Sequence, residues 1–385
     1  MSRRCSVSLR ILLVSAVMLL GAGRGLCGCY KRIFSFGDSI IDTGNFAHMA
    51  GNGPCQYKEF PFGMTFFRHP TGRISDGRVL VDFYAQALQL PLLPPSLPEK
   101  ESGKFPYGAN FAVLAATALP PDYFRRWNHK VASPFCLGVQ IGWFKEMLHR
   151  IAPGDSAKRK LLSESLIVLG EIGGNDYNFW FGAAKPREQA YQFIPDVVAR
   201  IGSAAQILLV RSSCRSHIYA CTLRELIGMG AKAIMIPNNF PIGCVPAQLT
   251  AHEHDTRPAD YDEHGCLRWF NDFSQRHNQA LRAEVNRLRA QHRDVRLIYA
   301  DYYGAAMEFV RDPHRFGIGD PLVACCGGDN RHHTSKRCDR TAKIWGNPSG
   351  FASWDGVHMT EKAYEVISHG VLNGPFADPP LLRTC

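Results

Sequence analysis

Short apolar runs alternate with long amphipathic stretches along this chain. Four strand-like runs recur at wide intervals, at residues 33–36, 165–169, 232–236 and 295–300. Between them the apolar residues repeat at helical spacing, most clearly over residues 270–291. Short buried strands that alternate with long helices predict an α/β fold, a three-layer α/β/α arrangement whose central sheet is mostly parallel.

The same spacing predicts further helices. One follows Val79 with the letters FYAQAL, and one runs through VVARIGSAAQILLV before Arg211. Another covers residues 360–372, with Thr360 at its start and Glu361 in its first turn. Because parallel strands end at one edge of a sheet, polar residues that follow different strands are expected to meet there.

The first 26 residues have a different pattern. Arg3, Arg4 and Arg10 precede the apolar run ILLVSAVMLLGAG, and small residues follow. This order is typical of a secretory signal peptide, and the run is short for a membrane span, although an uncleaved anchor is the alternative. We expect residues 27–385 to form a single domain that is not in the membrane after cleavage.

Charge gives a weaker signal. The chain carries 44 Lys and Arg against 34 Asp and Glu, a net charge of +10. The basic residues are scattered and interleaved with acids, which suits solubility or acidic cell-wall polymers and is not the footprint of a nucleic-acid-binding protein. We expect a monomer with no nucleic-acid partner.

Thirteen cysteines agree with a secretory route, where disulfides form. The adjacent Cys325 and Cys326 are expected to bond to different partners. Cys325, His332, His333 and Cys338 could instead form a zinc site, but their spacing matches no standard pattern. A disulfide-bonded loop is the favoured interpretation, and no metal or organic cofactor is expected.

A candidate nucleophile follows the first strand-like run, in KRIFSFGDSIIDTGNF. Gly37, Asp38 and Ser39 are ordinary turn residues, and a turn alone would explain them. The alternative is a serine placed at the carboxyl end of a buried strand, where open α/β sheets carry their chemistry. No Gly-x-Ser-x-Gly surrounds Ser39, so the nucleophile elbow of the α/β-hydrolases is excluded.

Polar residues also follow the second strand-like run. The letters GEIGGNDYN place Asn175 after paired glycines, where its side-chain amide could face developing negative charge, although Asn-Asp is also turn chemistry. The stretch FPYGANFAVLAATAL leads from a loop into small apolar residues and could be a buried Ala-rich segment.

A histidine and an aspartate lie three residues apart near the C-terminus, in SWDGVHMT. A general base needs an oriented imidazole whose cationic form is stabilised, and a neighbouring carboxylate does both. His358 is one of 15 histidines, and it becomes a candidate base only because Asp355 lies beside it and Ser39 follows another strand.

Together these stretches resemble the plant GDSL esterase/lipase family, within the SGNH hydrolases. The resemblance covers residues 33–375 through several blocks in the family's order: FGDSIIDTGN, PFGMTFFRHPTGRISDGRVLVDF, GEIGGNDYN, NNFPIGCVP, YADYYGAAMEF, PLVACCGG and WDGVHMT. It implies a flavodoxin-like fold, with Ser39 as nucleophile, His358 as base and Asp355 as its orienting residue. It also assigns the oxyanion hole to Ser39, Asn175 and the residue at position 115.

Position 115 departs from the family's pattern. The family's second block normally has a glycine there, and this chain has Ala115. An alanine keeps the backbone N–H, but it would be strained if the site needs a positive φ. Ala115 therefore leaves activity intact or weakens it. The segment 330–349 is also irregular for the family, and Ile40 replaces the name-giving leucine.

The resemblance implies a secreted serine esterase that is extracellular or in the cell wall, with the Golgi or vacuole as alternatives. The expected rim segments, residues 54–70, 91–106 and 327–350, are polar or mixed, which predicts a short acyl group such as acetyl on a cell-wall polysaccharide or a small plant metabolite. An acyltransferase would use the same acyl-enzyme, and a binding protein that has lost its activity is a third hypothesis.

Overall fold

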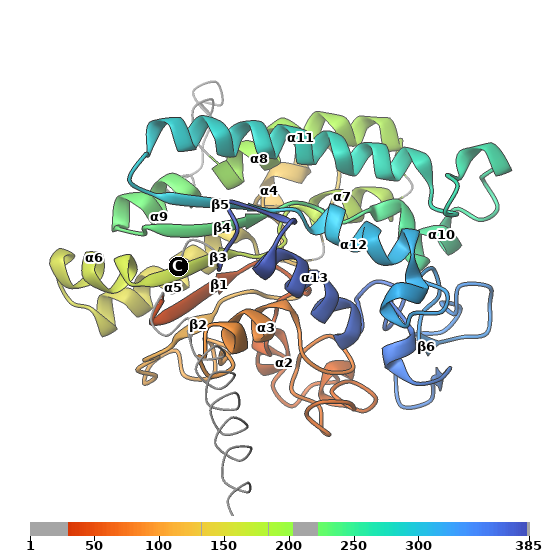
Figure 1. Cartoon of the computed structure of the whole chain (residues 1–385), viewed down its shortest axis with the longest axis horizontal. Helices are drawn as coiled ribbons and strands as arrows, with labels where there is room; N and C mark the ends of the chain where they lie inside the picture. The colour runs from red at the N-terminus through yellow and green to blue at the C-terminus, as the bar shows by residue number, and fades with distance from the viewer. Residues whose placement is uncertain (1–29, 132, 184, 203–221, 383–385) are drawn as a thin grey trace, which may run out of the picture.

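The central sheet has the order β2-β1-β3-β4-β5-β8 in the computed structural model, which describes residues 30–131, 133–183, 185–202 and 222–382 (Figure 1). The first five strands run parallel, and β8 runs antiparallel to β5. The strands are β1 (Arg32–Phe36), β2 (Gly108–Asn110), β3 (Ser165–Leu169), β4 (Ala233–Pro237), β5 (Arg296–Ala300) and β8 (Ala377–Asp378).

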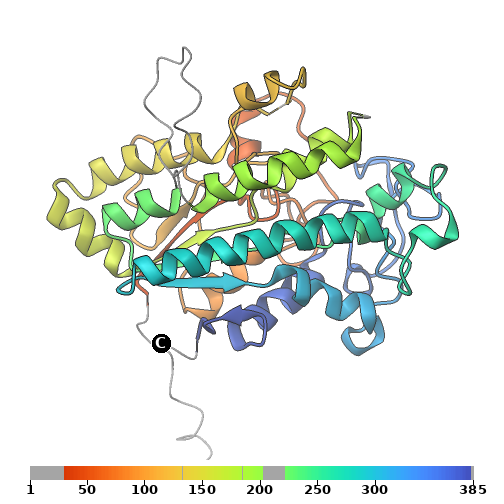
Figure 2. The same ribbon diagram turned by 90° about the horizontal axis from the view of Figure 1, so that it is seen from above.

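Two layers of helices cover this sheet. On one side α5, α8, α9 and α11 contact one another in a row, and on the other α3 contacts α13, which contacts α12. Figure 1 shows α8 and α11 above the strands and α3 and α13 below them, and Figure 2 shows α8 and α11 side by side. The fold class expected from the sequence is therefore confirmed.

The helices are α2 (Asn45–Met49), α3 (Leu80–Ala87), α4 (Pro121–Arg125), α5 (Leu137–Ile151), α6 (Asp155–Ser163), α7 (Gly174–Phe181), α8 (Ile194–Gly202), α9 (Thr222–Met229), α10 (Pro246–Ala251), α11 (Arg268–Gln291), α12 (Tyr302–Arg311) and α13 (Glu361–Asn373).

Aromatic side chains pack on both sides of β1, which lies between the two layers of helices. Phe34 and Phe36 point to the same face of the strand, and both rings contact Phe144 of α5, at centroid distances of 5.1 and 5.2 Å. On the opposite side, the hydroxyl of Tyr84 in α3 lies 2.9 Å from that of Tyr302 in α12. A strand buried on both faces needs a continuous apolar run, and RIFSF provides one.

All four predicted strands are present, with each end within one residue of the predicted one. The predicted helices correspond to α3, α11 and α13, and to α8 as far as Gly202. The rest of that predicted helix, residues 203–210, lies outside the described residues, as does the predicted signal peptide at 1–26. Within the described ranges, no helix is both long enough and apolar enough to cross a membrane.

The chain order places a crevice beside β1. The chain leaves β1 for β2 on one side and then crosses to β3 on the other. In open α/β sheets the ligand site lies at such a reversal, outside the carboxyl ends of the strands. A second, smaller hydrophobic core is built from Phe62, Ile74, Cys325, Cys326, Cys338 and Trp354.

Candidate active site

Ser39 lies in a tight turn directly after β1. Gly37 has a φ of 143°, and a Cβ there would come within 2.9 Å of the Glu171 carbonyl oxygen, so only glycine fits without a shift. The side chain of Gln140 in α5 accepts the Gly37 N–H at 2.9 Å and donates to its carbonyl at 2.7 Å. The turn therefore holds Ser39, which is 7% exposed, at the carboxyl edge of the sheet.

Asn175 comes to this turn from the neighbouring strand β3. Gly173, with a φ of 110°, precedes α7, and Asn175 is the second residue of that helix. Its Nδ2 donates to Oδ2 of Asp38 at 2.7 Å and to the carbonyl oxygen of Ala116 at 3.1 Å. Asp38 is the sequence neighbour of Ser39, and Ala116 is that of Ala115. The three expected oxyanion-hole residues are therefore close together.

Ala115 has a positive φ of 61°. This is the backbone conformation in which the sequence analysis expected an alanine to be strained. Its loop is fixed by Leu114, whose N–H donates to Asp42 at 3.0 Å, and by Ala116, whose N–H donates to Val113 at 3.1 Å. Among the described residues, the backbone N–H groups of Ser39 and Ala115 have no acceptor in the protein. Both are therefore available to a substrate oxygen.

Asp355 holds His358 through three atoms. Its Oδ2 lies 2.8 Å from the ring Nδ1 of His358, while Oδ1 accepts the backbone N–H groups of His358 and Val357 at 2.8 and 3.0 Å. Burial alone would raise the pKa of Asp355, but the charge of His358 and these hydrogen bonds lower it below its ordinary value. An ionised Asp355 keeps the proton on Nδ1, which leaves Nε2 able to accept one.

Tyr364 of α13 contacts the end of the histidine loop. Its hydroxyl accepts the Met359 N–H at 3.4 Å. Burial raises the pKa of Tyr364, and the charges of Asp355 and Asp38 raise it further, so both carboxyl groups act on one phenol. In the described part of the chain, the Ser39 hydroxyl makes no hydrogen bond with the imidazole of His358.

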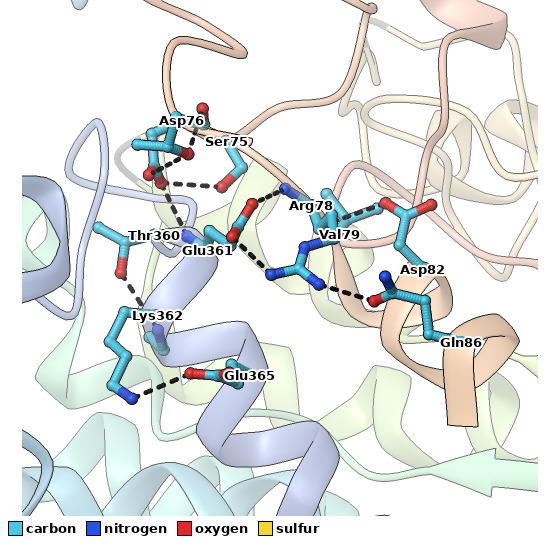
Figure 3. Close-up of polar contacts among 12 residues, drawn as sticks. Ser75, Asp76, Arg78, Val79, Asp82, Gln86, Thr360, Glu361, Lys362 and Glu365 are labelled. Atoms are coloured by element: carbon cyan, nitrogen blue, oxygen red, sulfur yellow. Dashed lines mark hydrogen bonds and ion pairs between the residues drawn. The ribbon is translucent and has the colours of Figure 1, made fainter. Parts of the chain in front are cut away.

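A clamp formed by Ser75, Asp76 and Arg78, which precede α3, and by Glu361 holds the segment that follows the histidine loop. Figure 3 shows these residues around the start of α13. Ser75 donates to the Met359 carbonyl at 3.0 Å, and Asp76 accepts the Glu361 N–H at 2.7 Å. The Glu361 carboxylate then accepts from the backbone and guanidinium of Arg78, both at 2.7 Å. These bonds join two segments nearly 300 residues apart and fix where His358 lies.

Comparison with known proteins gives a family for this arrangement. The family described as GDSL-like Lipase/Acylhydrolase matches residues 33–371. The chain belongs to this family. A GDSL esterase/lipase of Arabidopsis thaliana is 40% identical over 93% of this chain and 88% of its own length. Sinapine esterase of Brassica napus is 37% identical over 97% of this chain and 93% of its own length.

Membership in the GDSL family confirms the resemblance seen in the sequence and makes the chain a carboxylic ester hydrolase. The roles of individual residues stay predictions. The structure brings Asp355 to His358 and places Asn175 beside the neighbours of Ser39 and Ala115.

The cysteine predictions were partly wrong. Cys326 is bonded to Cys338, but Cys325 is a free, buried thiol whose Sγ lies 3.9 Å from the Gly346 carbonyl oxygen. A second disulfide joins Cys244 and Cys266. Since Cys338 is in a disulfide, it cannot supply a thiolate to the zinc site that the sequence left open. Within the described residues, no group of three His, Cys, Asp or Glu side chains is arranged to hold a metal.

Sequence reasoning missed several residues that shape the site. Gln140, Asp76, Arg78 and Glu171 lie outside the short motifs or had no role assigned within them. Glu171 carried a detectable signal, because a carboxyl group directly after a buried strand needs a partner.

Proposed function

We propose that the chain is a serine esterase in which Ser39 attacks the ester, His358 acts as general base and Asp355 orients the histidine. The observation that carries this proposal is the 2.8 Å contact between Asp355 Oδ2 and His358 Nδ1, whose side chains are both buried. A buried carboxylate on Nδ1 is the arrangement that makes Nε2 basic enough to activate a hydroxyl.

The reaction follows from these positions. The Ser39 oxygen forms a bond to the carbonyl carbon, its proton moves to His358 Nε2, and the carbonyl electrons go to the oxygen. When the tetrahedral intermediate collapses, the alcohol leaves with the proton from Nε2. Water then repeats the sequence, with Nε2 as base and the Ser39 oxygen as leaving group, to release the acid.

Three donors are suited to the negative oxygen of the intermediate. The N–H groups of Ser39 and Ala115 are free within the described protein. The amide of Asn175 donates one hydrogen to Asp38 at 2.7 Å and the other to the Ala116 carbonyl at the longer distance of 3.1 Å. We infer that the second hydrogen turns to the oxyanion while the first stays on Asp38. Loss of one such donor costs about 2.7–4 kcal/mol.

The proposed substrate is a short acyl ester of a hydroxylated carrier, either a cell-wall polysaccharide or a small plant metabolite. The polar or mixed composition of the expected rim segments, residues 54–70, 91–106 and 327–350, supports this proposal. The name of the Brassica napus relative, sinapine esterase, supports the metabolite alternative.

We propose further that the protein is secreted and monomeric. The N-terminal pattern of residues 1–26 supports an oxidising compartment, as do the disulfides Cys244–Cys266 and Cys326–Cys338 in the described part of the chain. Transfer of the acyl group to a sugar hydroxyl would use the same acyl-enzyme, and product analysis with an alcohol acceptor separates it from hydrolysis.

The deciding experiment combines a fluorophosphonate probe with the Ser39→Ala variant. Wild type should be labelled quickly, and Ser39→Ala and His358→Ala should not. Turnover of a short-chain aryl ester should fall in parallel, and a chain-length series should decline before twelve carbons. A Ser39→Ala protein with wild-type turnover would refute the nucleophile. An unlabelled wild type that is labelled after Ala115→Gly would support the inactive binding protein.

A further inference from the structure

Two buried carboxyl groups lie behind the proposed nucleophile. Asp38 follows β1 and Glu171 follows β3, and the two carboxyl groups are near enough that an interaction between them shifts the pKa of both. Asp38 is 2% exposed and Glu171 is 5% exposed. The strands bring them together because Phe36 pairs with Leu169 in register, and the Asp38 N–H then donates to the Glu171 carbonyl at 3.1 Å. Two carboxyl groups in such contact cannot both be ionised, so they share one proton.

Each carboxyl group also holds one part of the site. Asp38 accepts the Ile40 N–H at 3.0 Å, which closes the turn around Ser39, and accepts the Asn175 amide at 2.7 Å. Glu171 accepts the Gly174 N–H at 3.0 Å, in the first turn of the helix that carries Asn175. The pair therefore connects the nucleophile turn to the oxyanion helix through a few short bonds.

The surroundings of the pair favour the shared proton. The titratable groups that act on it are a carboxyl group, Asp176, and the buried phenols of Tyr177, Tyr302 and Tyr364. Burial raises the pKa of Asp38 and Glu171, and the charge of Glu171 raises that of Asp38 further. When the pair keeps one proton, Asp38 and Glu171 do not repel each other, and each can still accept its N–H bonds from the protein.

We propose that Glu171 is a positioning residue, which holds Asp38 in the orientation that fixes both the Ser39 turn and the Asn175 amide. This inference rests on the proposed function, because it assigns Asn175 and Ser39 their catalytic roles. When the pair loses its shared proton at alkaline pH, the two carboxylates repel each other and the Asn175 amide moves away from the oxyanion. Activity then falls with an apparent pKa that belongs to the pair.

Two substitutions of Glu171 test this role. Glu171→Gln keeps an oxygen for the Gly174 N–H and offers Asp38 an N–H that never ionises. We expect normal fluorophosphonate labelling at neutral pH and no decline on the alkaline side. Glu171→Leu removes both contacts, and we expect labelling of the folded protein to slow roughly a hundredfold, as for a small misplacement of catalytic groups. Glu164→Gln, at the opposite end of β3 in an exposed ion pair with Lys31, is the matched control and should follow wild type.

Labelling rates and kcat for an aryl ester are measured across pH, with circular dichroism to select folded variants. The positioning role is overturned if wild type shows no alkaline decline, if Glu171→Gln keeps that decline, or if folded Glu171→Leu is labelled at the wild-type rate. The proposed function fails separately, if wild type is not labelled or if Ser39→Ala is labelled as fast as wild type.

Discussion

A single carboxylate, that of Asp355, holds both the ring and the backbone of His358. One oxygen lies 2.8 Å from the ring Nδ1 and the other accepts the His358 N–H at 2.8 Å. The imidazole therefore cannot rotate without losing its bond to the carboxylate whose other oxygen shapes its loop. This coupling distinguishes an orienting aspartate from one that only adds negative charge.

Asp355→Asn should lower kcat for an aryl ester by about four orders of magnitude, because an amide can donate to Nδ1 and stabilise the wrong tautomer. The Asn oxygen can still accept the backbone N–H groups, so the fold should remain native by circular dichroism. Glu365→Gln, an exposed carboxylate on α13, is the control and should keep wild-type kcat. Near-normal turnover in Asp355→Asn would refute the orienting role.

The clamp on the histidine loop predicts a stability effect. Glu361 receives two charge-assisted bonds from Arg78, and both side chains are 17% exposed. Glu361→Gln should lower the free energy of unfolding by about 1.5–3 kcal/mol in urea titrations. It should also lower kcat, because the loop that carries His358 loses one of its supports.

Lys362→Gln is the matched control for this change. It breaks the neighbouring ion pair between Lys362 and Glu365, whose side chains are 33% and 50% exposed. The free energy of unfolding should therefore fall by at most about 1 kcal/mol. Equal losses in the two variants would show that the Arg78 contacts add nothing beyond an ordinary surface pair.

Local patterns in the sequence were sufficient for four strands of the central sheet and for the residue types of the site. A run such as SLIVL is buried on both faces and cannot be mistaken for an exposed segment, and β3 begins and ends where that run does. Ser39 and Asn175 could be placed near each other because each lies in the segment that follows a parallel strand. Asp355 and His358 are close in sequence, so their contact was also predictable.

Other features depend on contacts that no local pattern records. β2 has three residues, GAN, and pairs with β1 only because the sheet supplies its partner. The bonds between Arg78 and Glu361 and between Asp38 and Glu171 join segments more than 100 residues apart. Cys325 looked like a disulfide partner by composition, but its neighbours in space leave it a free thiol.

The positive φ of Ala115 predicts that a glycine would be more favourable there. An alanine in the left-handed region is strained by about 1–2 kcal/mol, which glycine would relieve. Glycine loses more conformational entropy on folding, and this offsets about 0.5–1 kcal/mol of that gain. Ala115→Gly should therefore stabilise the protein by up to about 1 kcal/mol, measured as a higher midpoint in urea. Fluorophosphonate labelling should be as fast as in wild type or faster, since the N–H is kept.

Ala116→Gly is the control for that substitution. Ala116 is fully buried and does not have a positive φ, so glycine there should destabilise by about 0.5–1 kcal/mol. If Ala115→Gly is destabilising by the same amount, the left-handed backbone at Ala115 carries no strain, and the departure from the family's glycine has no energetic consequence.

Asp176 should make stability depend on pH. Its carboxylate accepts the N–H groups of Ala118 and Leu119 at 2.7 and 2.9 Å, but burial raises its pKa from 3.8 to about 7. Between these two values the folded protein binds a proton that the unfolded chain does not, so the free energy of unfolding falls as pH rises through this window. His277, whose pKa burial lowers to about 3, acts in the opposite direction, so the effect must be isolated by comparison with a variant.

Asp176→Asn removes the titration and keeps one acceptor oxygen. It should be less stable than wild type at acidic pH, by about 1 kcal/mol for the lost bond. As pH rises toward 7, wild type should lose stability relative to the variant by a few kcal/mol, at about 1.4 kcal/mol per pH unit. Urea unfolding of both proteins across this range measures the difference, with exposed Glu101→Gln as the control that should run parallel to wild type. A stability difference between wild type and Asp176→Asn that stays constant with pH would mean that Asp176 remains ionised in the fold, despite its burial.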